Sequence, residues 1–197
     1  MTARSWAYLA FFWLALAANA TAQAQLSWTD LPPLPNTPGF GGPFVGSHNG
    51  RLIVAGGANF PTAPPWQGGE KAWHDTVFAL DPSATAWRNA GELDAPRAYG
   101  AAVSTRHGIA LIGGNDSGRA YDTCQLLVID QTTLRARFEA LPPLPARTAF
   151  PAAAASGDTI YVAAGSDGTD PTAMTHAFWS LDLAAEPRTW TSLPAWP

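Results

Sequence analysis

The sequence predicts an all-β protein, a β-propeller made of four-stranded blades. Its 197 residues include 18 Gly, 18 Pro and 9 Trp but only 13% charged residues, which is typical of a folded, turn-rich β protein. A unit of about fifty residues repeats along the chain, and no stretch has the i, i+3, i+4, i+7 spacing of a substantial helix. Because a four-stranded unit cannot bury both of its faces alone, such units are expected to stack around a common axis.

The first segment of the repeat opens with an aromatic residue and closes with a Leu followed by Pro or by a Pro-containing turn. We expect this aromatic residue to begin the fourth strand of a blade and to place a large apolar plate between neighbouring blades. The segment occurs as "WTDLPPLP" (28–35), "WRNAGELDAPR" (87–97), "FEALPPLPAR" (138–147) and "WTSLPAWP" (190–197). The first of these, Trp28 to Pro35, is expected to be an outermost strand donated to the last blade, which would close the ring.

The second segment consists of two apolar strands joined by a polar turn. The second strands of the three blades are predicted to be "RLIVAGG", "GIALIGG" and "TIYVAAG". The pairs Gly56-Gly57 and Gly113-Gly114 indicate a sharp turn near the crowded axis, where a Cβ would clash or φ must be positive. The third unit departs from this pattern, with Ala164-Gly165 in the same place.

The third segment is an apolar strand that ends at an aspartate. It reads "HDTVFALDP", "YDTCQLLVID" and "THAFWSLDL", which end at Asp81, Asp130 and Asp182. Cys124 lies in the second of these strands and is the only cysteine, so no internal disulfide can form. We expect its thiol to be buried and inert.

Residues 1–24 are interpreted as a secretory signal peptide. Arg4 precedes the apolar run "WAYLAFFWLALAANA", and A-x-A cleavage choices follow it. The run is shorter than the roughly 20 residues of a spanning helix, although an uncleaved anchor is the alternative. Residues 25–197 are therefore expected to form a partial propeller that is periplasmic or secreted, with no membrane contact once the signal is removed. A formal charge of -4 without any basic run disfavours nucleic acid as a partner.

A long aromatic connection, Gly56 to Leu80, separates the second and third strands of the first blade. Such connections lie at one mouth of a propeller, where an insertion can form a pocket wall. We expect Trp66 and Trp73 to offer flat faces to a sugar ring, Asn59 and Gln67 to offer amide groups, and Lys71 to offer a cation. The alternative is that the tryptophans only pack the connection onto its blade and that Asp75 caps a turn.

Two arginines stand at the same repeat position, Arg97 in "APRAYGAA" and Arg147 in "PARTAFPAA". Their guanidinium groups would suit a substrate carboxylate, while a structural arginine that bonds backbone carbonyls between blades is the alternative. Asn115 and Asp116 follow the second glycine pair as Ala58 and Asn59 follow the first. They are candidates for substrate binding at the mouth, and turn chemistry explains them nearly as well.

The glycine pairs, the strand-ending aspartates, the blade aromatics and the Leu-Pro closures resemble kelch repeats from about Leu26 onward. The pattern "GGANFP…PW.GG.K.WHD" is similar to a long first-blade loop in the kelch-type mutarotase family that includes N-acetylneuraminate epimerase and its cyclically permuted relatives. The resemblance implies six blades, of which the sequence contains three. We expect either a fragment or association with a missing half-propeller, because an open arc would leave apolar blade faces in water.

The resemblance further implies an isomerase that interconverts the anomers of a sialic acid or a related sugar without a cofactor. Ring opening and closure need one group to protonate the ring oxygen and another to take the anomeric hydroxyl proton. The acid–base candidates of this chain are Glu70, His74 and Asp75, and the catalytic pair can equally lie beyond Pro197. The competing interpretation is a non-catalytic kelch module that binds a carbohydrate or a protein.

Other chemistries find less support in the sequence. His48, His74, His107 and His176 have no mutual zinc-ligand spacing, so no metal is expected. The sequence contains no recognisable nucleophile elbow or P-loop, and no recognisable set of the Tyr and His ligands that kelch copper oxidases need. A glycosidase-like carboxylate pair drawn from Glu70, Asp75 and Asp116 remains an open alternative.

Overall fold

The computed structural model describes residues 26–35, 38–168 and 174–195, and the predicted signal peptide lies outside them. The chain divides into two units, Met1–Leu31 and Pro32–Pro197. In the first unit, the described residues 26–31 have no regular secondary structure, and Leu26, Trp28 and Leu31 are exposed. The second unit contains every strand of the described chain.

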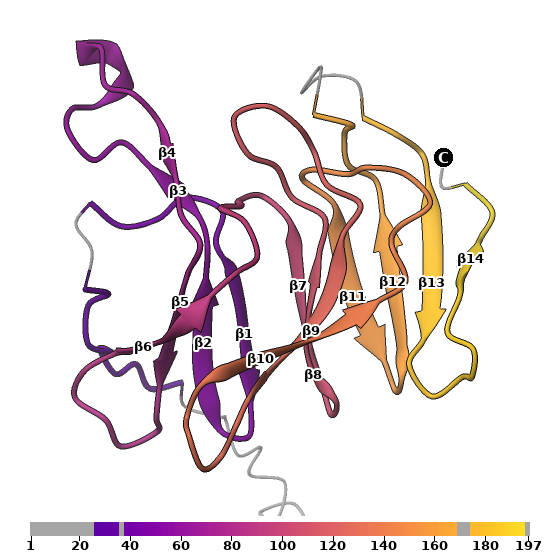
Figure 1. Cartoon of the computed structure of the whole chain (residues 1–197), viewed down its shortest axis with the longest axis horizontal. Helices are drawn as coiled ribbons and strands as arrows, with labels where there is room; N and C mark the ends of the chain where they lie inside the picture. Colours follow the sequence, from indigo (N-terminus) through magenta and orange to yellow (C-terminus); the bar gives the residue numbers. More distant parts are fainter. Residues whose placement is uncertain (1–25, 36–37, 169–173, 196–197) are drawn as a thin grey trace, which may run out of the picture. The chain divides into compact units, whose positions relative to one another are not determined.

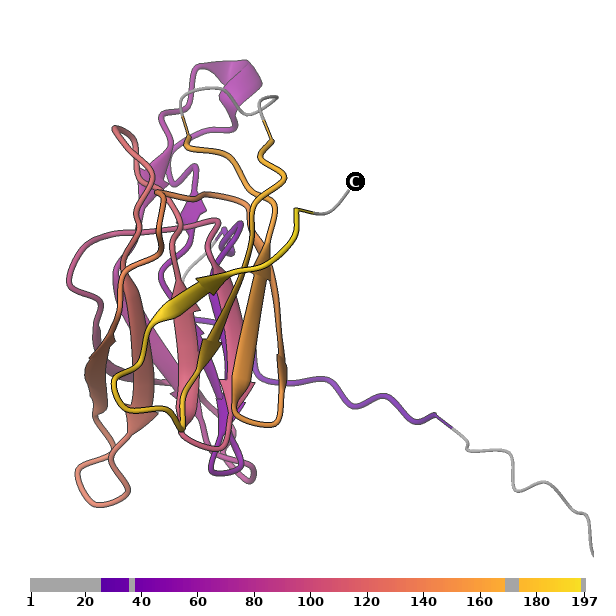
Figure 2. The ribbon, with the colours of Figure 1, turned by 90° about the vertical axis from the view of Figure 1, so that its right-hand side faces the viewer.

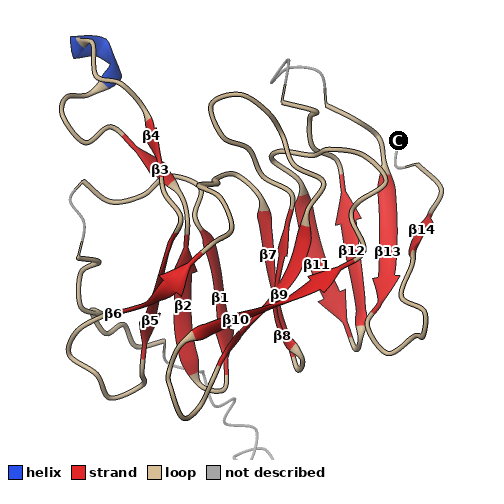
Figure 3. Cartoon of the chain, in the orientation of Figure 1, coloured by secondary structure: helices blue, strands red, loops and turns tan. Residues whose placement is uncertain are grey.

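Three four-stranded antiparallel sheets follow one another along the second unit (Figures 1 and 3). The strands of the first blade are β1 (Phe44–His48), β2 (Arg51–Ala55), β5 (Thr76–Leu80) and β6 (Arg88–Glu92). Those of the second are β7 (Ala101–Thr105), β8 (Gly108–Ile112), β9 (Cys124–Ile129) and β10 (Ala136–Leu141). Those of the third are β11 (Ala152–Ser156), β12 (Thr159–Ala163), β13 (Phe178–Asp182) and β14 (Trp190–Ser192). The all-β propeller prediction, with its three blades and the predicted second strands β2, β8 and β12, is confirmed.

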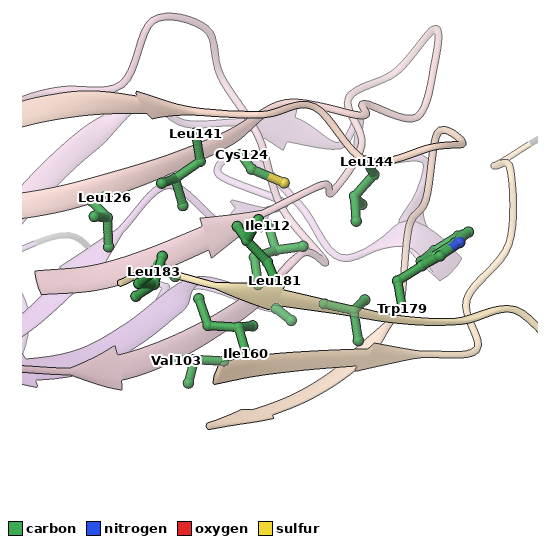
Figure 4. Close-up of a cluster of buried hydrophobic side chains, with 13 residues drawn as sticks. Val103, Ile112, Cys124, Leu126, Leu141, Leu144, Ile160, Trp179, Leu181 and Leu183 are labelled. Atoms are coloured by element: carbon green, nitrogen blue, oxygen red, sulfur yellow. The ribbon is translucent and has the colours of Figure 1, made fainter. Parts of the chain in front are cut away.

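The blades are held together by two apolar cores, one at each blade-to-blade interface. The first joins β1, β2 and β5 to β8 and β9, and the second joins the other face of the second blade to the third. In the second core, Ile112 and Leu126 pack against Ile160 and Leu181 (Figure 4). Burial of one such aliphatic side chain contributes about 1.5–3 kcal/mol, so these interfaces are the main stabilising contacts of the arc.

Two of the predicted blade aromatics, Phe138 and Trp190, pack against these cores. Trp190 packs against the second core, and its Nε1 donates to the Pro142 carbonyl at 2.8 Å. Trp87 makes the same kind of bond to the Pro32 carbonyl at 2.7 Å. Pro32 therefore accepts a hydrogen bond from the tryptophan of the first blade in the same way that Pro142 accepts one from the tryptophan of the third blade.

The prediction that Trp28 to Pro35 is an outermost strand of the last blade stays a prediction. These residues are not paired with any strand of the described chain. A strand is defined by hydrogen bonds to a neighbour, and the blade that this segment was predicted to complete is not among the three four-stranded sheets.

The backbone at the end of each second strand is left-handed, as the glycine pairs predicted. φ is 63° and 103° at Gly56 and Gly57, and 60° and 97° at Gly113 and Gly114. The third blade keeps the same geometry with an alanine, because φ is 60° at Ala164 and 97° at Gly165. This position demands a left-handed residue in all three blades, whichever side chain it carries.

The long connection in the first blade contains regular structure of its own. It contains a two-stranded ribbon, β3 (Ala58–Asn59) paired with β4 (Ala72–Trp73), and a 3-10 turn, η1 (Pro65–Gln67). Figures 1 and 2 show it at the same end of the second unit as the other connections between second and third strands. The described residues include no helix of the length and hydropathy that a membrane crossing requires.

Candidate functional site

The candidate site lies at the end of the blades that we call the loop face, made of residues 56–75, 93–100, 113–123 and 142–151. These connections join second to third strands within a blade and fourth to first strands between blades, so antiparallel pairing brings them to one end (Figure 1). The innermost strands β1, β7 and β11 lie side by side below this face. Two hollows open on it.

The first hollow, of about 630 Å³, lies against the β3–β4 ribbon and is lined mainly by apolar groups. Its lining includes two of the predicted site residues, Asn59 and Trp66, together with Phe60, several prolines and Tyr99. The Trp66 side chain is 82% exposed, so it does not pack the connection onto the blade. The prediction of a pocket wall therefore fits the geometry of this ribbon.

His74 is held by the base of the ribbon. Its Nε2 lies 2.8 Å from the Asn59 Oδ1, and the Asn59 Nδ2 donates to the Pro38 carbonyl at 3.0 Å. The Phe40 ring meets the imidazole edge-on, with 4.9 Å between centroids. The structure brings Asn59 and His74 together, and this contact gives His74 a supporting role for the pocket wall.

The three acid–base candidates do not meet in either hollow. Glu70 is exposed near the 3-10 turn, and Asp75 is half-buried where the ribbon joins β5. Neither these carboxylates nor His74 lines the first or the second hollow. Their catalytic role remains a prediction.

Lys71 carries a cation that is positioned by aromatic rings. Its Nζ lies 4.3 Å from the centroid of Tyr99 and 5.1 Å from that of Trp73. No ion pair of Lys71 with an Asp or Glu is present in the part of the chain that the structure describes. An ammonium group that is oriented by cation–π contacts and lacks a counter-charge is suited to an anionic ligand.

The second hollow, of about 290 Å³, is lined by charged side chains. Asp94 comes from the connection after β6, Arg119, Tyr121 and Asp122 from the connection before β9, and Arg147 from the connection before β11. The predicted site residue Arg147 is therefore at a ligand-accessible surface. Guanidinium groups beside a small polar hollow favour recognition of a carboxylate.

Arg97 has a different environment from Arg147. Its side chain is 1% exposed, and its Nη2 donates to the Asp94 Oδ1 at 2.7 Å and to the Gln125 Oε1 at 3.3 Å. The Tyr121 ring covers the guanidinium at 5.3 Å. These contacts favour the structural alternative, in which Arg97 joins the first blade to the second.

The prediction that Arg97 and Arg147 share one repeat position is wrong, because the structure aligns Arg97 with Thr148. The Gly57 N–H donates to the Arg97 carbonyl at 2.8 Å, and the Gly114 N–H donates to the Thr148 carbonyl at 2.9 Å. Arg97 and Thr148 are both buried. Arg147 lies one residue earlier, and its exposed side chain has no hydrogen bond or ion pair within the described residues.

Asp116 takes part in its own turn, as the turn-chemistry alternative proposed. It accepts hydrogen bonds from the Tyr121 hydroxyl at 2.6 Å and from the Gly118 and Arg119 N–H groups at 2.7 and 3.0 Å. Burial raises the pKa of Asp116, but these hydrogen bonds outweigh it, so the pKa lies below its usual value. The Asn115 backbone pairs with that of Ala98 and thereby links the connection 113–123 to the connection 93–100.

Cys124 is buried, as predicted, and burial raises the pKa of its thiol to about 12. The thiol is therefore protonated and unreactive at neutral pH. Among the residues that the structure describes, no three His, Cys, Asp or Glu side chains form a group that could hold a metal ion.

Sequence reasoning missed two residues of the loop face, Tyr99 and Phe150. Their ring centroids are 5.0 Å apart, and both stand two residues before an innermost strand. The signal was available in the repeat alignment, because "RAYG" and "TAFP" place an aromatic residue at the same position.

The blade order, the glycine turns and the first-blade ribbon define a kelch-type β-propeller. The sequence profile of the N-acetylneuraminate epimerase family matches residues 15–136, and the chain belongs to this family. The match includes the first blade, strands β7 to β9 of the second blade and most of the loop face.

Curated relatives with the name N-acetylneuraminate epimerase support this assignment. A protein of Haemophilus influenzae is 34% identical over 120 residues, which cover 53% of this chain and 32% of that protein. A Pasteurella multocida protein is 35% identical over 123 residues, with the same coverages. A Yersinia pestis protein is 40% identical over 91 residues, which cover 41% of this chain and 22% of that protein. The matched region thus spans about a third or less of these relatives.

The solved structure of YjhT is similar in fold. It superposes with a TM-score of 0.70 and 17% sequence identity, over 89% of this chain and 57% of that one. At this identity the likeness establishes the architecture of the blades alone.

Proposed function

We propose that this chain forms part of a site that exchanges the anomers of N-acetylneuraminate or a closely related acidic sugar. The observation that carries the proposal is membership of the N-acetylneuraminate epimerase family over residues 15–136, which include the ribbon, the first hollow and most of the second. The curated relatives bear the name of this activity. A cofactor is not needed, because ring opening and closure break and re-form one C–O bond with proton transfers at the two oxygens and no change of oxidation state.

The charge of the loop face supports an acidic sugar. N-acetylneuraminate carries a carboxylate on its anomeric carbon, and both Lys71 and Arg147 present cations without a carboxylate partner in the described chain. Each charge-assisted hydrogen bond to such a carboxylate contributes about 1.5–3 kcal/mol. Arg97 makes a weaker candidate, because its Nη2 is already engaged by Asp94 and Gln125.

The acid–base step has two candidates in this chain. Glu70 and Asp75 are carboxylates without a hydrogen-bonded partner for their side chains in the described residues, whereas His74 is engaged by Asn59. We propose that one of these carboxylates transfers a proton at the sugar ring and that the second group comes from blades outside this sequence. A propeller site is built by loops of all blades, so a divided catalytic pair agrees with the architecture.

The open third blade supports association with further blades. Four of the five residues of its innermost strand β11 are exposed, although β7 lies on its other side. We propose that additional blades, or a second half-propeller, cover this surface. We also propose that the mature protein is periplasmic or secreted, because residues 1–24 are interpreted as a signal peptide.

The test is anomer exchange followed by proton NMR, starting from a freshly dissolved single anomer of N-acetylneuraminate. We expect Lys71→Gln and Arg147→Gln each to lower kcat/KM roughly ten- to a hundredfold, which corresponds to about 1.4–2.7 kcal/mol. The methyl ester of the same sugar has no carboxylate and should be affected much less. Arg137→Gln is the matched control, because Arg137 is an exposed arginine of β10 that pairs with Asp130.

A chain that does not accelerate exchange, alone or with the remaining blades supplied, would refute the proposed activity. The second candidate function is a non-catalytic kelch module that binds a carbohydrate. It is favoured by the absence of Glu70, His74 and Asp75 from the lining of both hollows. Binding of N-acetylneuraminate without exchange would support this second function.

A further inference from the structure

Three residues at one repeat position, two residues before the innermost strand of each blade, share a left-handed backbone conformation. φ is 59° at Gly42, 58° at Tyr99 and 57° at Phe150. Glycine enters this left-handed region freely, but a bulky aromatic residue rarely does. Two aromatic side chains are therefore kept at a position for which glycine is the unstrained choice.

A chain of backbone hydrogen bonds fixes this conformation from blade to blade. The Tyr99 N–H donates to the Gly42 carbonyl at 2.8 Å, and the Phe150 N–H donates to the Tyr99 carbonyl at 2.7 Å. Each residue lies two positions before the innermost strand of its blade, β1, β7 or β11. The two aromatic residues consequently stand next to each other at the rim of the innermost strands.

The two rings form one surface that belongs to neither apolar core. Their centroids are 5.0 Å apart with 35° between the planes, and the Phe150 side chain is 44% exposed. A Cβ on Gly42 would lie 2.4 Å from the Tyr99 Cδ1, so the glycine of the first blade makes room for the Tyr99 ring. Core packing in the described residues does not account for these rings.

The surroundings of the pair are those of a ligand surface. Tyr99 borders the first hollow, and its hydroxyl has no hydrogen bond to any described residue. The Lys71 ammonium lies 4.3 Å from the Tyr99 centroid. An apolar face, a polar hydroxyl and a positive charge meet here within one small region.

We propose that the exposed Phe150 ring, supported by the Tyr99 ring, forms a stacking platform for the apolar C–H face of a pyranose ring, and that the Lys71 ammonium, which lies over the Tyr99 ring, binds the carboxylate of an acidic sugar beside it. This inference rests on the proposed function and adds the residues that position the sugar. The left-handed backbone is the device that holds both rings at the rim, because a right-handed or extended residue would direct its Cβ elsewhere.

The test is saturation-transfer difference NMR on the full chain, with N-acetylneuraminate and its methyl ester as probes. Stacking does not require the carboxylate, so both probes should show transfer to their ring C–H protons. Phe150→Gly should reduce this signal at least fivefold while the urea midpoint stays equal or rises, because the variant removes the ring and relieves the backbone. Ala164→Gly is the matched control, since it relieves a left-handed residue with φ of 60° without removing a ring, and its signal should stay parental.

Phe150→Leu keeps an apolar side chain in the same place but removes the flat aromatic face. A folded Phe150→Leu variant with a reduced signal supports the platform, and one with the parental signal overturns it. The platform is also overturned if the unsubstituted chain shows transfer to neither probe, or if Phe150→Gly lowers the urea midpoint and thereby shows a packing role. Ring-dependent binding with no anomer exchange in any variant would sink the proposed activity and leave the platform standing.

Discussion

The left-handed residue that ends each second strand offers a sharp test of how the blades pack. Gly56, Gly113 and Ala164 occupy this position, with φ of 63°, 60° and 60°. A Cβ on Gly113 would lie 2.3 Å from the Thr148 carbonyl oxygen, and a Cβ on Gly56 would lie 2.4 Å from the Arg97 carbonyl oxygen. Ala164 shows that the backbone conformation itself tolerates a Cβ where that contact is missing.

The expected magnitude for Gly113→Ala follows from three contributions. The left-handed conformation costs a non-glycine residue about 1–2 kcal/mol. The loss of unfolded-state entropy on replacing glycine offsets about 0.4–1 kcal/mol of this. The clash adds about 1–3 kcal/mol, because the Thr148 oxygen accepts a hydrogen bond from the Gly114 N–H at 2.9 Å and cannot move away freely. We therefore expect Gly113→Ala to lower the free energy of unfolding by about 1–4.5 kcal/mol.

The reverse substitution, Ala164→Gly, should raise the free energy of unfolding by up to about 1 kcal/mol, because it removes only the backbone cost. The assay is urea unfolding followed by tryptophan fluorescence, with the slope m compared between variants. The predicted clash with the Thr148 carbonyl is refuted if Gly113→Ala lowers the free energy of unfolding by no more than Ala164→Gly raises it. Equal m values are required for the comparison, since a changed slope would report a changed unfolded or native ensemble.

Three further predictions concern single side chains. Burial raises the pKa of the Cys124 thiol from 9.0 to about 12, so the thiol ionises at a lower pH in the unfolded chain than in the folded one. The free energy of unfolding should therefore fall as the pH rises from about 9 towards 12. Cys124→Ala should remove this fall, as measured by urea unfolding at several pH values. Arg97→Ala should cost about 2–3 kcal/mol because it removes a fully buried side chain and leaves a cavity between the blades, whereas Arg147→Ala should cost less than about 0.5 kcal/mol; equal losses in urea unfolding would contradict the contrast. Tyr121→Phe removes a hydrogen bond to Asp116 and should therefore raise the pKa of that carboxyl. The low pKa of Asp116 stabilises the folded protein at pH values above the pKa of the unfolded state, and in the variant this stabilisation should be lost at a higher pH as the pH falls. Carbon-13 NMR of the carboxyl group follows the titration.

The strands and turns of this protein could be predicted from the sequence because their signals are local. Apolar runs separated by polar turns specify β2, β8 and β12, and the glycine pairs indicate the left-handed turns that end two of them. The burial of Cys124 follows from its place in an apolar run. The ribbon within the long connection was not predictable, because each of its strands has only two residues and no periodicity can appear over that length.

The candidate site depended on contacts between blades, which only the tertiary structure decided. The sequence by itself placed Arg97 and Arg147 at one repeat position and marked Lys71 as a cation of the long connection. The structure separated the two arginines, because Thr148, and not Arg147, makes the backbone contacts between blades that Arg97 makes.

Asp94 and Gln125 hold Arg97, whereas Arg147 lies one residue before the corresponding position and is exposed. The letters of these residues are in the sequence, but two similar segments do not reveal a shift of one residue, nor which side chains of the next blade reach an arginine. Repetition in the sequence therefore determined the segments in which these residues lie. The packing of successive blades determined which of them is buried and which can meet a ligand.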